Sequence, residues 1–452
     1  MSAGLKRWKP YPAYKDSGVE WLGMMPEGWK ISRSLFYFEF VTSGSRAWAQ
    51  FYADSGSPFV RIGNIRRDSI QSDLSVLMYV EAPSGMEAER TAIKVGDIFI
   101  SITADIGSVG IATPAVEGGY ISQHIALCRP NKQSAHSRFL AYAISSTIGK
   151  NQLLSSSYGG TKVQLSLTDI KNIHLALPPL PEQQAIAAFL DQQCTQIDSL
   201  IEKKQRMLEL LEEKRDAVIT QAVTRGLDPT VPMKDSGVEW LGMVPEGWEV
   251  KRLRFLVTTN PSKAEVRLSS NDFASFVPME AVGKYGGMQC QECCLDEIDS
   301  GYTFFADGDI LIAKITPCFE NVKGAIAENL TNGIGFGSTE FHVVRPLSAM
   351  HTAYCFWVTI SSLFRNIGEA HMYGAGGQKR IPDMFIKNFP LPTPPLPEQQ
   401  AIADYLDAQC AAMDSQRKNL EKSIELLREY RASLITHAVT GKIDVRDVAP
   451  LQ

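Results

Sequence analysis

Three cysteines in the second half of the chain come nearest to the spacing of a metal site. Cys290, Cys293 and Cys294 form a Cys-x-x-Cys-Cys cluster. A tetrahedral zinc site needs a second pair of ligands at suitable spacing, and only the scattered Cys318 and His342 are on offer. The cluster therefore favours free thiols over zinc, as expected in a reducing compartment, and we expect no metal site.

The motifs of several common enzyme chemistries are missing. The sequence has no GxxxxGK[ST] phosphate loop, no [DN]PP[FYW] methyltransferase motif and no GxSxG nucleophile elbow. Gly333, Gly335 and Gly337 form a glycine cluster without the strand–turn–helix pattern of a dinucleotide site. The chain therefore gives no sign of its own catalytic centre, although a scattered nuclease carboxylate set stays open.

The positions of the remaining features follow from an internal repeat. Lys15–Lys30 and Lys234–Glu249 match at 14 of 16 positions, and we call each copy a tryptophan motif. Pro178–Cys194 and Pro394–Cys410 match at 14 of 17 positions. The sequences between these blocks have diverged. Two alike frames that hold two unlike inserts predict one scaffold that presents two different binding heads.

Composition and charge set broad limits. A chain of 452 residues with 44% apolar content should form two to four globular domains. It has no apolar run long enough to cross a membrane and no signal peptide, which predicts a cytoplasmic protein. The net charge of −5 does not by itself suggest nucleic acid. The first insert (Ile31–Leu177) has 13 basic and 11 acidic residues, and the second (Val250–Thr393) has 13 and 14.

Each insert has an α/β pattern. Short β-branched runs bounded by Gly-Asp and other turn signals predict strands. The predicted strands are Ile98–Ile102, Val109–Ala112, Ile121–Cys128, Ile310–Ile315 and Phe341–Val344. Helices are predicted over Ser137–Ser146 and Met350–Phe364. The tryptophans of each motif, Trp21 and Trp29 with Trp240 and Trp248, are expected to be packing anchors.

A proline-rich hinge and a long helix follow each insert. Pro181 and Pro397 suit a first helical position, and Gly226 and Gly441 suit left-handed caps at the helix ends. Apolar residues recur at alternating steps of four and three, with two basic residues among them in each copy, Lys204 and Arg215 in the first and Arg417 and Arg431 in the second. The predicted seam residues are Ile197, Ile201, Leu208, Leu211 and Val218, with Met413, Leu420, Ile424, Leu427 and Leu434 in the second copy.

Two such helices in a direct repeat are expected to pair with each other. A pseudo-twofold axis would then relate each residue to its copy 216 positions later and make the helices antiparallel. The predicted fold is α/β (α+β) inserts in pseudo-twofold tandem, separated by two long antiparallel coiled-coil helices. The predicted segments are 1–177, 178–228, 229–393 and 394–452, namely the first motif and insert, the first hinge and helix, and their second copies.

The duplicated tryptophan motif, the LPPLPEQQAIA hinge, Asp198 and Asp414 near the helix starts, and the Ala-Val-Thr helix ends resemble the specificity subunit of type I restriction–modification enzymes, HsdS. The resemblance spans almost the whole chain. It implies two target-recognition domains that each recognise half of a split site on double-stranded DNA. It also implies two methyltransferase subunits as partners and, through them, restriction subunits. S-adenosylmethionine, Mg²⁺ and ATP would be cofactors of those partners, with none in this chain.

The resemblance places DNA contacts on polar loops of the inserts, where side chains can reach base edges and phosphates. The candidates in the first insert are Arg61, Asn64, Arg66, Arg67, Thr103, Tyr158, Thr161, Lys162 and Gln164. Those in the second insert are Lys314, Thr316, Tyr373, Gln378, Lys379 and Arg380.

The seam from Gln196 to Ala222 gives a length for the spacer. Its 27 residues would span roughly 40 Å, close to one turn of DNA, which predicts a gap of about 5–8 unread base pairs. Two alternatives stay open: a coiled-coil assembly scaffold that does not touch DNA, and a fused methyltransferase or nuclease with its own unrecognised site.

Overall fold

The computed structural model describes residues 8–44, 46, 48–82, 85–157, 164–265, 272–298, 301–375 and 377–446. Contacts divide the chain into two units, one formed by Met1–Gln205 with Glu421–Gln452 and the other by Arg206–Leu420. The boundary falls inside both long helices, α5 (Leu180–Arg225) and α10 (Leu396–Val439). Each unit therefore combines one insert with a section of each helix.

The first insert contains two four-stranded sheets. One is antiparallel, in the order β4 (Phe38–Ser43), β11 (Ile125–Pro130), β8 (Ile98–Ser101) and β9 (Val109–Ile111). The other has the order β10 (Tyr120–Ile121), β6 (Ser57–Val60), β7 (Met78–Val80) and β5 (Tyr52–Ala53), with β10 parallel to β6. The short helix α1 (Met86–Thr91) lies between β7 and β8 in the chain.

The second insert repeats this plan despite its different sequence. Its antiparallel sheet has the order β16 (Val257–Thr259), β23 (Phe341–Pro346), β20 (Ile310–Ala313) and β21 (Gly324–Ile326). Its other sheet has the order β18 (Gln291–Cys294), β17 (Phe273–Val277), β22 (Ile334–Gly337) and β19 (Thr303–Ala306), and α6 (Leu295–Ile298) follows β18. β17 pairs in parallel with β22, as β6 does with β10. The fourth strand differs, because β5 pairs with β7 whereas β19 pairs with β22. Apart from that edge strand, the two inserts share one framework.

A buried carboxylate explains the Gly-Asp turns before β8 and β20. Arg129 contacts Asp97 through Nε and Nη2 at 2.9 and 2.7 Å, and Arg345 contacts Asp309 from the same two atoms at 2.7 Å each. Both carboxylates are buried, so each needs these charge-assisted bonds. Each ion pair thus ties the start of one inner strand, β8 or β20, to the neighbouring inner strand, β11 or β23.

Two predicted elements are wrong in extent. The predicted strand Ile121–Cys128 is the end of β10 and most of β11, separated by a turn in which Ile125 N donates to Ser122 O. The predicted helix Met350–Phe364 is two helices, α7 (Thr352–Ile360) and α8 (Ser362–Ala370). Ser361 breaks it because its hydroxyl caps α8 by accepting a hydrogen bond from Phe364 N.

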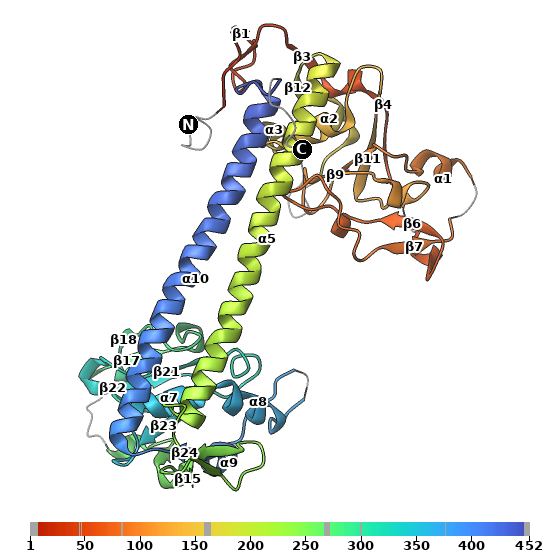
Figure 1. The fold of residues 1–452 in the computed structure, drawn as a ribbon. Coiled ribbons are helices and arrows are strands. Elements are labelled where there is room, and N and C mark those ends of the chain that lie inside the picture. The colour runs from red at the N-terminus through yellow and green to blue at the C-terminus, as the bar shows by residue number, and fades with distance from the viewer. Residues whose placement is uncertain are drawn as a thin grey trace. The chain divides into compact units, whose positions relative to one another are not determined.

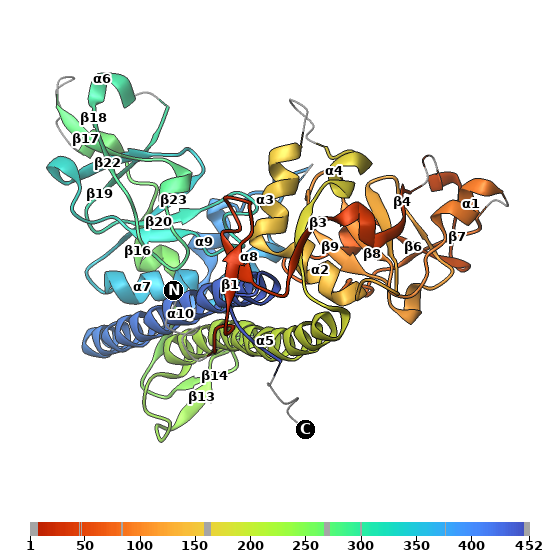
Figure 2. The ribbon, with the colours of Figure 1, turned by 90° about the horizontal axis from the view of Figure 1, so that it is seen from above.

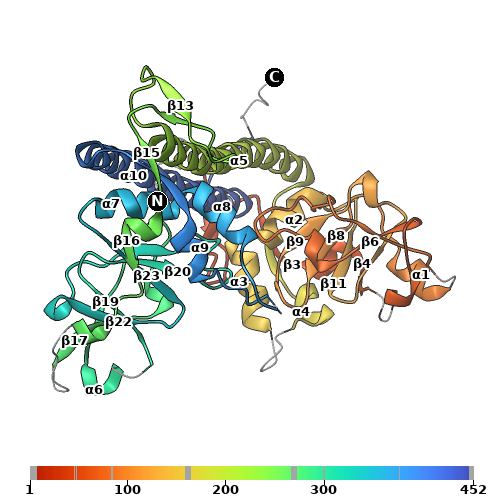
Figure 3. The same cartoon turned by 90° about the horizontal axis from the view of Figure 1, so that it is seen from below.

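Helices join each insert to the long helices of its own unit. In the first unit these are α2 (Ser137–Ser145), α3 (Thr147–Ser156) and α4 (Leu167–Lys171). The helix α2 lies beside α5 (Figure 2), and its Arg138 and Tyr142 both contact Asp191 of α5. In the second unit, α7 lies between the sheet that contains β20 and β23 and the helix α10 (Figure 3). Its Trp357 donates to Asp407 of α10. The helix α9 (Asp383–Asn388) follows α8. Each insert is thus fixed onto its helix sections.

The tryptophan motifs form small hairpins. β1 (Tyr14–Asp16) pairs with β2 (Met24–Pro26) in the first, and β13 (Met233–Asp235) with β14 (Met243–Pro245) in the second. Strands at the two ends of each insert then pair, β3 (Lys30–Arg33) with β12 (His174–Leu177) and β15 (Glu249–Arg252) with β24 (Pro390–Thr393). This pairing closes each insert as a domain.

The tryptophans of each motif separate into two kinds. Trp29 and Trp248 are fully buried, as expected of packing anchors. Trp29 Nε1 donates to Glu182 Oε1 at the start of α5, at 3.1 Å. Trp21 and Trp240, however, are 44% and 38% exposed, although the ring of Trp240 still packs against Phe389 with 5.2 Å between ring centroids. Both follow the Asp-Ser-Gly turn at the tip of the hairpin, where the hairpin leaves them half in solvent.

The long helices extend further than the seam and run antiparallel (Figure 1). They begin at Leu180 and Leu396, one residue before the predicted prolines, and Gly226 and Gly441 follow their ends with φ near +75° and +70°. A Cβ on Gly226 would lie 3.1 Å from Trp248, and one on Gly441 would collide with Pro26. Each tryptophan motif therefore covers the end of one helix.

Candidate nucleic-acid interface

A polar cluster lies where β8 ends in the first insert. Ile102 N donates to His124 O, and Leu165 N donates to Ile102 O. Thr103 and Gln164 form an isolated antiparallel bridge. The structure thus brings together two of the predicted DNA contacts, Thr103 and Gln164, from segments about 60 residues apart.

The side chains of this cluster are ordered around His124. Its Nδ1 lies 2.9 Å from Thr103 Oγ1, and its Nε2 lies 3.1 Å from Gln123 Nε2. His124 and Gln164 are exposed. Both ring nitrogens have partners, which fixes the plane of the imidazole while its edge faces solvent.

The second insert has a corresponding cluster at the end of β20. Lys314 N donates to Glu340 O, Ile381 N donates to Lys314 O, and Ile315 forms a bridge with Arg380. Arg380 binds Glu340 through two atoms, with Nε 2.9 Å from Oε2 and Nη2 2.7 Å from Oε1. The Arg380 guanidinium holds the pKa of the Glu340 carboxyl below its usual value. The carboxylate therefore stays ionised and keeps the arginine in place.

Two residues of these clusters escaped the sequence analysis, His124 and Glu340. They occupy equivalent places because each accepts, through its carbonyl, the bond from the residue that follows β8 or β20. They also lie 216 positions apart, the offset of the duplicated hinges. Gln164 and Arg380 share that offset. The sequence marks neither residue, because the offset alone does not say which positions of the inserts share a surface.

The other candidates of the second insert surround its cluster. Thr316 donates from its backbone N to Lys379 O at 2.9 Å, and Tyr373 pairs with Arg380 by two backbone bonds. Tyr373, Gln378 and Lys379 are exposed, while Lys314 is half-buried. The two chain segments predicted from sequence as separate polar loops therefore form one surface.

The segment from Arg61 to Arg67 divides into structural and exposed residues. Asn64 is 4% exposed, and its amide donates to the carbonyls of Asp73 and Val76 while accepting from Arg61 N. This hydrogen bonding disagrees with a base contact by Asn64, because the side chain has no free face. Arg61 is half-buried beside it. Arg66 and Arg67 are exposed and pair with Asp73 and Asp105.

Three predicted contacts, Tyr158, Thr161 and Lys162, lie outside the described residues. The described part of that segment begins at Gln164.

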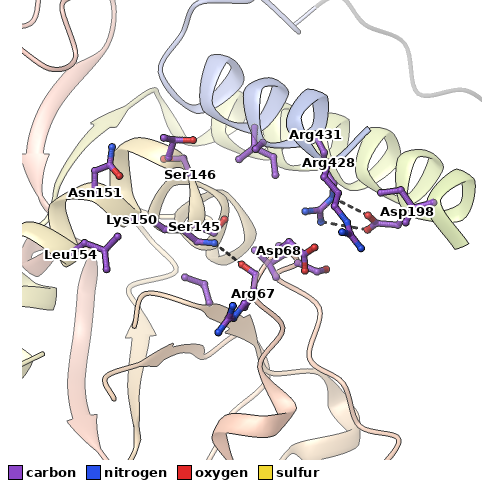
Figure 4. A pocket seen from close by; sticks show the side chains of 17 residues that line it. Arg67, Asp68, Ser145, Ser146, Lys150, Asn151, Leu154, Asp198, Arg428 and Arg431 are labelled. Atoms are coloured by element: carbon purple, nitrogen blue, oxygen red, sulfur yellow. Dashed lines mark hydrogen bonds and ion pairs between the residues drawn. The ribbon is translucent and has the colours of Figure 1, made fainter. Parts of the chain in front are cut away.

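A cavity of about 250 Å³ separates the loop around Arg67 from the helices of the first unit (Figure 4). Lys150 reaches across from α3 and donates to Arg67 O at 2.5 Å. On the helix side, Arg431 of α10 pairs with Asp198 of α5, Nε to Oδ1 at 3.0 Å. The exposed Arg428 lines the same wall. The cavity thus has a polar lining drawn from the insert and both helices.

The predicted seam residues lie on the covered side of both helices. None of them is exposed, whereas Leu200, Met207 and Leu210 beside the seam are. The most buried seam residues include the two arginines, Arg215 and Arg431. Arg215 contacts Asp414 and donates to Cys410 O at 3.2 Å in the second unit, as Arg431 contacts Asp198 in the first.

The cysteine cluster is not gathered around a centre. Cys293 and Cys294 are consecutive on β18 and so face opposite sides of the sheet, and Cys290 is exposed before the strand. Among the residues that the structure describes, no three His, Cys, Asp or Glu side chains are placed to hold a metal ion. Within the same ranges, no helix is both long enough and apolar enough to span a bilayer.

Comparison with known proteins identifies the family. The family model of the type I restriction modification DNA specificity domain matches residues 45–210 and 245–426, and therefore both inserts. The chain belongs to this family. The family predicted from the duplicated motifs is thereby confirmed.

Individual relatives support the assignment over different lengths. The EcoEI specificity subunit of Escherichia coli is 44% identical over 162 residues, which cover 35% of this chain and 27% of that protein. The chain thus spans about a quarter of that relative's length. The putative MjaX specificity subunit of Methanocaldococcus jannaschii is 24% identical over 437 residues, 94% of this chain and 96% of that one.

Solved structures share the fold. A structure of a type I restriction–modification system, described for its complex assembly and conformational transition, superposes with a TM-score of 0.69 at 17% identity, covering 93% of this chain and 99% of that one. The HsdS subunit of Thermoanaerobacter tengcongensis gives a TM-score of 0.52 at 18% identity, covering 93% and 98%. The predicted architecture of tandem inserts and two long helices is therefore confirmed.

Proposed function

We propose that this specificity subunit recognises a bipartite, asymmetric DNA site, with each insert contacting one half-site of about 3–5 base pairs. The observation that carries the proposal is the pair of equivalent clusters. One framework presents His124 and Gln164 in the first insert and Glu340 and Arg380 in the second. Amide and guanidinium groups differ in the base edges they prefer, so two such heads would recognise unlike sequences.

The spacing between half-sites would be set by α5 and α10. Both helices continue across the boundary between the units, with 46 and 44 residues. A stiff helix pair transmits a fixed separation where a loop would not. We propose an unread gap of about 5–8 base pairs, from the seam length and the helical repeat of DNA.

Two methyltransferase subunits are the proposed protein partners, and the tryptophan motifs are proposed as part of their docking surface. Each motif exposes a tryptophan and a methionine, Trp21 with Met24 and Trp240 with Met243, and a phenylalanine follows each at Phe36 and Phe255. Exposed apolar residues of this size mark interaction surfaces. Because the two sets match while the inserts differ, they suit two copies of the same subunit.

Catalysis would belong to the partners. S-adenosylmethionine would be the cofactor of the methyltransferase subunits, and Mg²⁺ and ATP those of the restriction subunits that bind through them. The relatives' names as specificity subunits support this division. A cytoplasmic location accords with such partners and stays a prediction.

The deciding experiment maps methylated bases genome-wide in cells that carry the methyltransferase subunit with and without this chain. We expect one bipartite motif that appears only when the chain is present. The same motif without the chain, or no sequence preference with it, would contradict the proposal and leave the scaffold alternative. Methyl transfer or cleavage by the purified chain alone would favour the enzyme alternative.

The docking surface has its own test. Purified Trp21→Ala and Trp240→Ala variants should each bind one methyltransferase subunit fewer by mass measurement, and the double variant should bind none. Val76→Ala, which alters another strongly exposed apolar residue of the first unit, is the matched control. Full binding by the double variant would exclude these residues from the interface.

A further inference from the structure

We infer that one equivalent pair of residues in each insert, His124 with Gln164 and Glu340 with Arg380, selects a base in its half-site. The inference rests on the proposed DNA recognition and names residues that decide its specificity. It begins from the backbone. Ile102 N, directly after β8, donates to the carbonyl of His124 at 3.0 Å. Lys314 N, directly after β20, donates to the carbonyl of Glu340 at 2.9 Å.

The second backbone connection agrees as closely. Leu165 N and Ile381 N each donate, at 2.9 Å, to the carbonyl of the residue that follows β8 or β20, Ile102 or Lys314. Gln164 and Arg380 immediately precede these donors, and each forms the same kind of antiparallel bridge. The two pairs are therefore held in the same backbone positions by hydrogen bonds that do not involve their side chains.

The side chains at these positions differ in charge and in hydrogen-bonding pattern. The first insert offers an imidazole and a neutral amide, and Gln123 adds a second amide beside them. The second insert offers a carboxylate and a guanidinium. A structural role alone would not call for this difference, because the surrounding bonds are the same. A difference confined to side chains on a matching backbone is what two heads for different bases require.

The chemistry assigns a preference to each head. Glu340 engages Nε and one Nη2 hydrogen of Arg380, which leaves three of the five guanidinium N–H groups available. An arginine held in this way is suited to the O6 and N7 acceptors of guanine. Gln164 can instead donate and accept as the N7 and N6 groups of adenine require. We assign guanine to Arg380 and adenine to Gln164.

The test exchanges the pairs and maps methylated sites with the methyltransferase subunit. His124→Glu with Gln164→Arg should alter one position of the first half-site toward guanine and leave the second half-site and the gap unchanged. Glu340→His with Arg380→Gln should alter one position of the second half-site away from guanine. The change in preference should be roughly 5- to 150-fold, the range for one bidentate base contact.

Two outcomes would overturn the inference. The first is an unchanged motif with fewer methylated sites overall, which indicates phosphate contacts or a structural role. The second is a change in both half-sites from one exchange. A wild-type chain that confers no motif would contradict the proposed function itself, so the two failures are distinguishable.

Single variants keep the test decisive if an insert that carries the exchanged pair of residues fails to fold. Arg380→Lys retains the charge and the attraction to phosphate but loses the planar fork. It should relax the guanine preference while thermal unfolding stays close to wild type, and an unchanged preference would overturn the assignment. Arg206→Gln, which removes an exposed arginine paired with Glu209 on α5, is the matched control and should leave the motif unchanged.

Discussion

Arg431 of α10 faces Asp198 of α5 in the first unit, with Nε 3.0 Å from Oδ1. The second unit contains the same contact with the roles of the helices exchanged, between Arg215 of α5 and Asp414 of α10. Each arginine lies 216 residues from its counterpart, and so does each aspartate. Antiparallel helices of repeated sequence allow both contacts, because the arginine of one copy then meets the aspartate of the other copy within each unit. These pairs therefore mark the register of the helices.

The two sides of this ion pair should differ in their effect on stability. The arginine side chains are 7% and 4% exposed, whereas Asp198 and Asp414 are 44% and 47% exposed. Asp198→Ala would leave a buried cation without its partner and should lower the free energy of unfolding by about 2–4 kcal/mol. Arg431→Met leaves the half-exposed carboxylate of Asp198 beside an apolar side chain. It should lower the free energy of unfolding by only about 0–1.5 kcal/mol.

Urea unfolding of the four single variants measures this asymmetry. Asp414→Ala and Arg215→Met provide the internal control, because they should repeat the order in the other unit. If the arginine and aspartate variants lost equal free energy of unfolding, burial of the guanidinium would not explain the stability of the ion pair.

The two tryptophans of one motif should behave differently although they are eight residues apart. Trp29 is buried and hydrogen-bonded to Glu182, so Trp29→Ala should lower the free energy of unfolding by about 3–5 kcal/mol. Trp21 is 44% exposed, so Trp21→Ala should change it by less than about 1.5 kcal/mol. Thermal unfolding compares them, and similar losses would contradict the separation into an anchor and a surface residue.

Exchange of a whole insert should change one half-site only. Replacing Ile31–Leu177 with the insert of another family member should preserve the fold, because β3 and β12 pair at the base and close the domain. Methylation mapping should show a new first half-site with the old second half-site and gap. A change in both halves would mean that the inserts do not act independently.

The helices should determine the gap in the recognised site. Removing one heptad from each helix shortens each by about 10 Å, or roughly three base pairs of DNA, while keeping the seam in phase. We expect a shorter gap in the methylated motif or loss of methylation, while each half-site keeps its sequence where methylation persists. An unchanged gap would exclude α5 and α10 as the spacer. Removing two residues from each helix turns the seam by about 200°, so it is the out-of-phase control and should disrupt the pairing.

The second unit should lose stability in mild acid because of His342. Burial lowers the pKa of His342, whose Nε2 lies 2.9 Å from Ile381 O. Its pKa is thus lower in the folded than in the unfolded state, so the unfolded state takes up the proton first. Stability should therefore fall as pH drops below about 6.5, by at most ~1.4 kcal/mol per pH unit from this group.

His342→Gln can still donate to Ile381 O and should flatten the pH profile between pH 7 and 5. Denaturant unfolding at several pH values measures it. His174→Gln, at an exposed position of β12, is the control and should leave the slope as in wild type. An unchanged slope in His342→Gln would show that another group governs acid unfolding.

The sequence by itself determined the frame of this protein. The steps of four and three predict two paired helices, the prolines and glycines indicate their ends, and the repeat predicts their antiparallel arrangement. These features are local or periodic, so neighbouring residues suffice to identify them. The strands Ile98–Ser101 and Ile310–Ala313 were visible for the same reason, because turn signals bound an apolar run.

Only the tertiary structure decided which residues share a surface. His124 and Glu340 gain their place from hydrogen bonds to residues far away in the chain, and no local pattern marks them. Asn64 has the composition of a loop contact, yet distant carbonyls bury its amide. Trp21 and Trp29 lie in the same short motif and were expected to be alike, but only Trp29 meets a helix end. The difference in each case comes from long-range packing, which determines where a side chain lies and what remains free to bind.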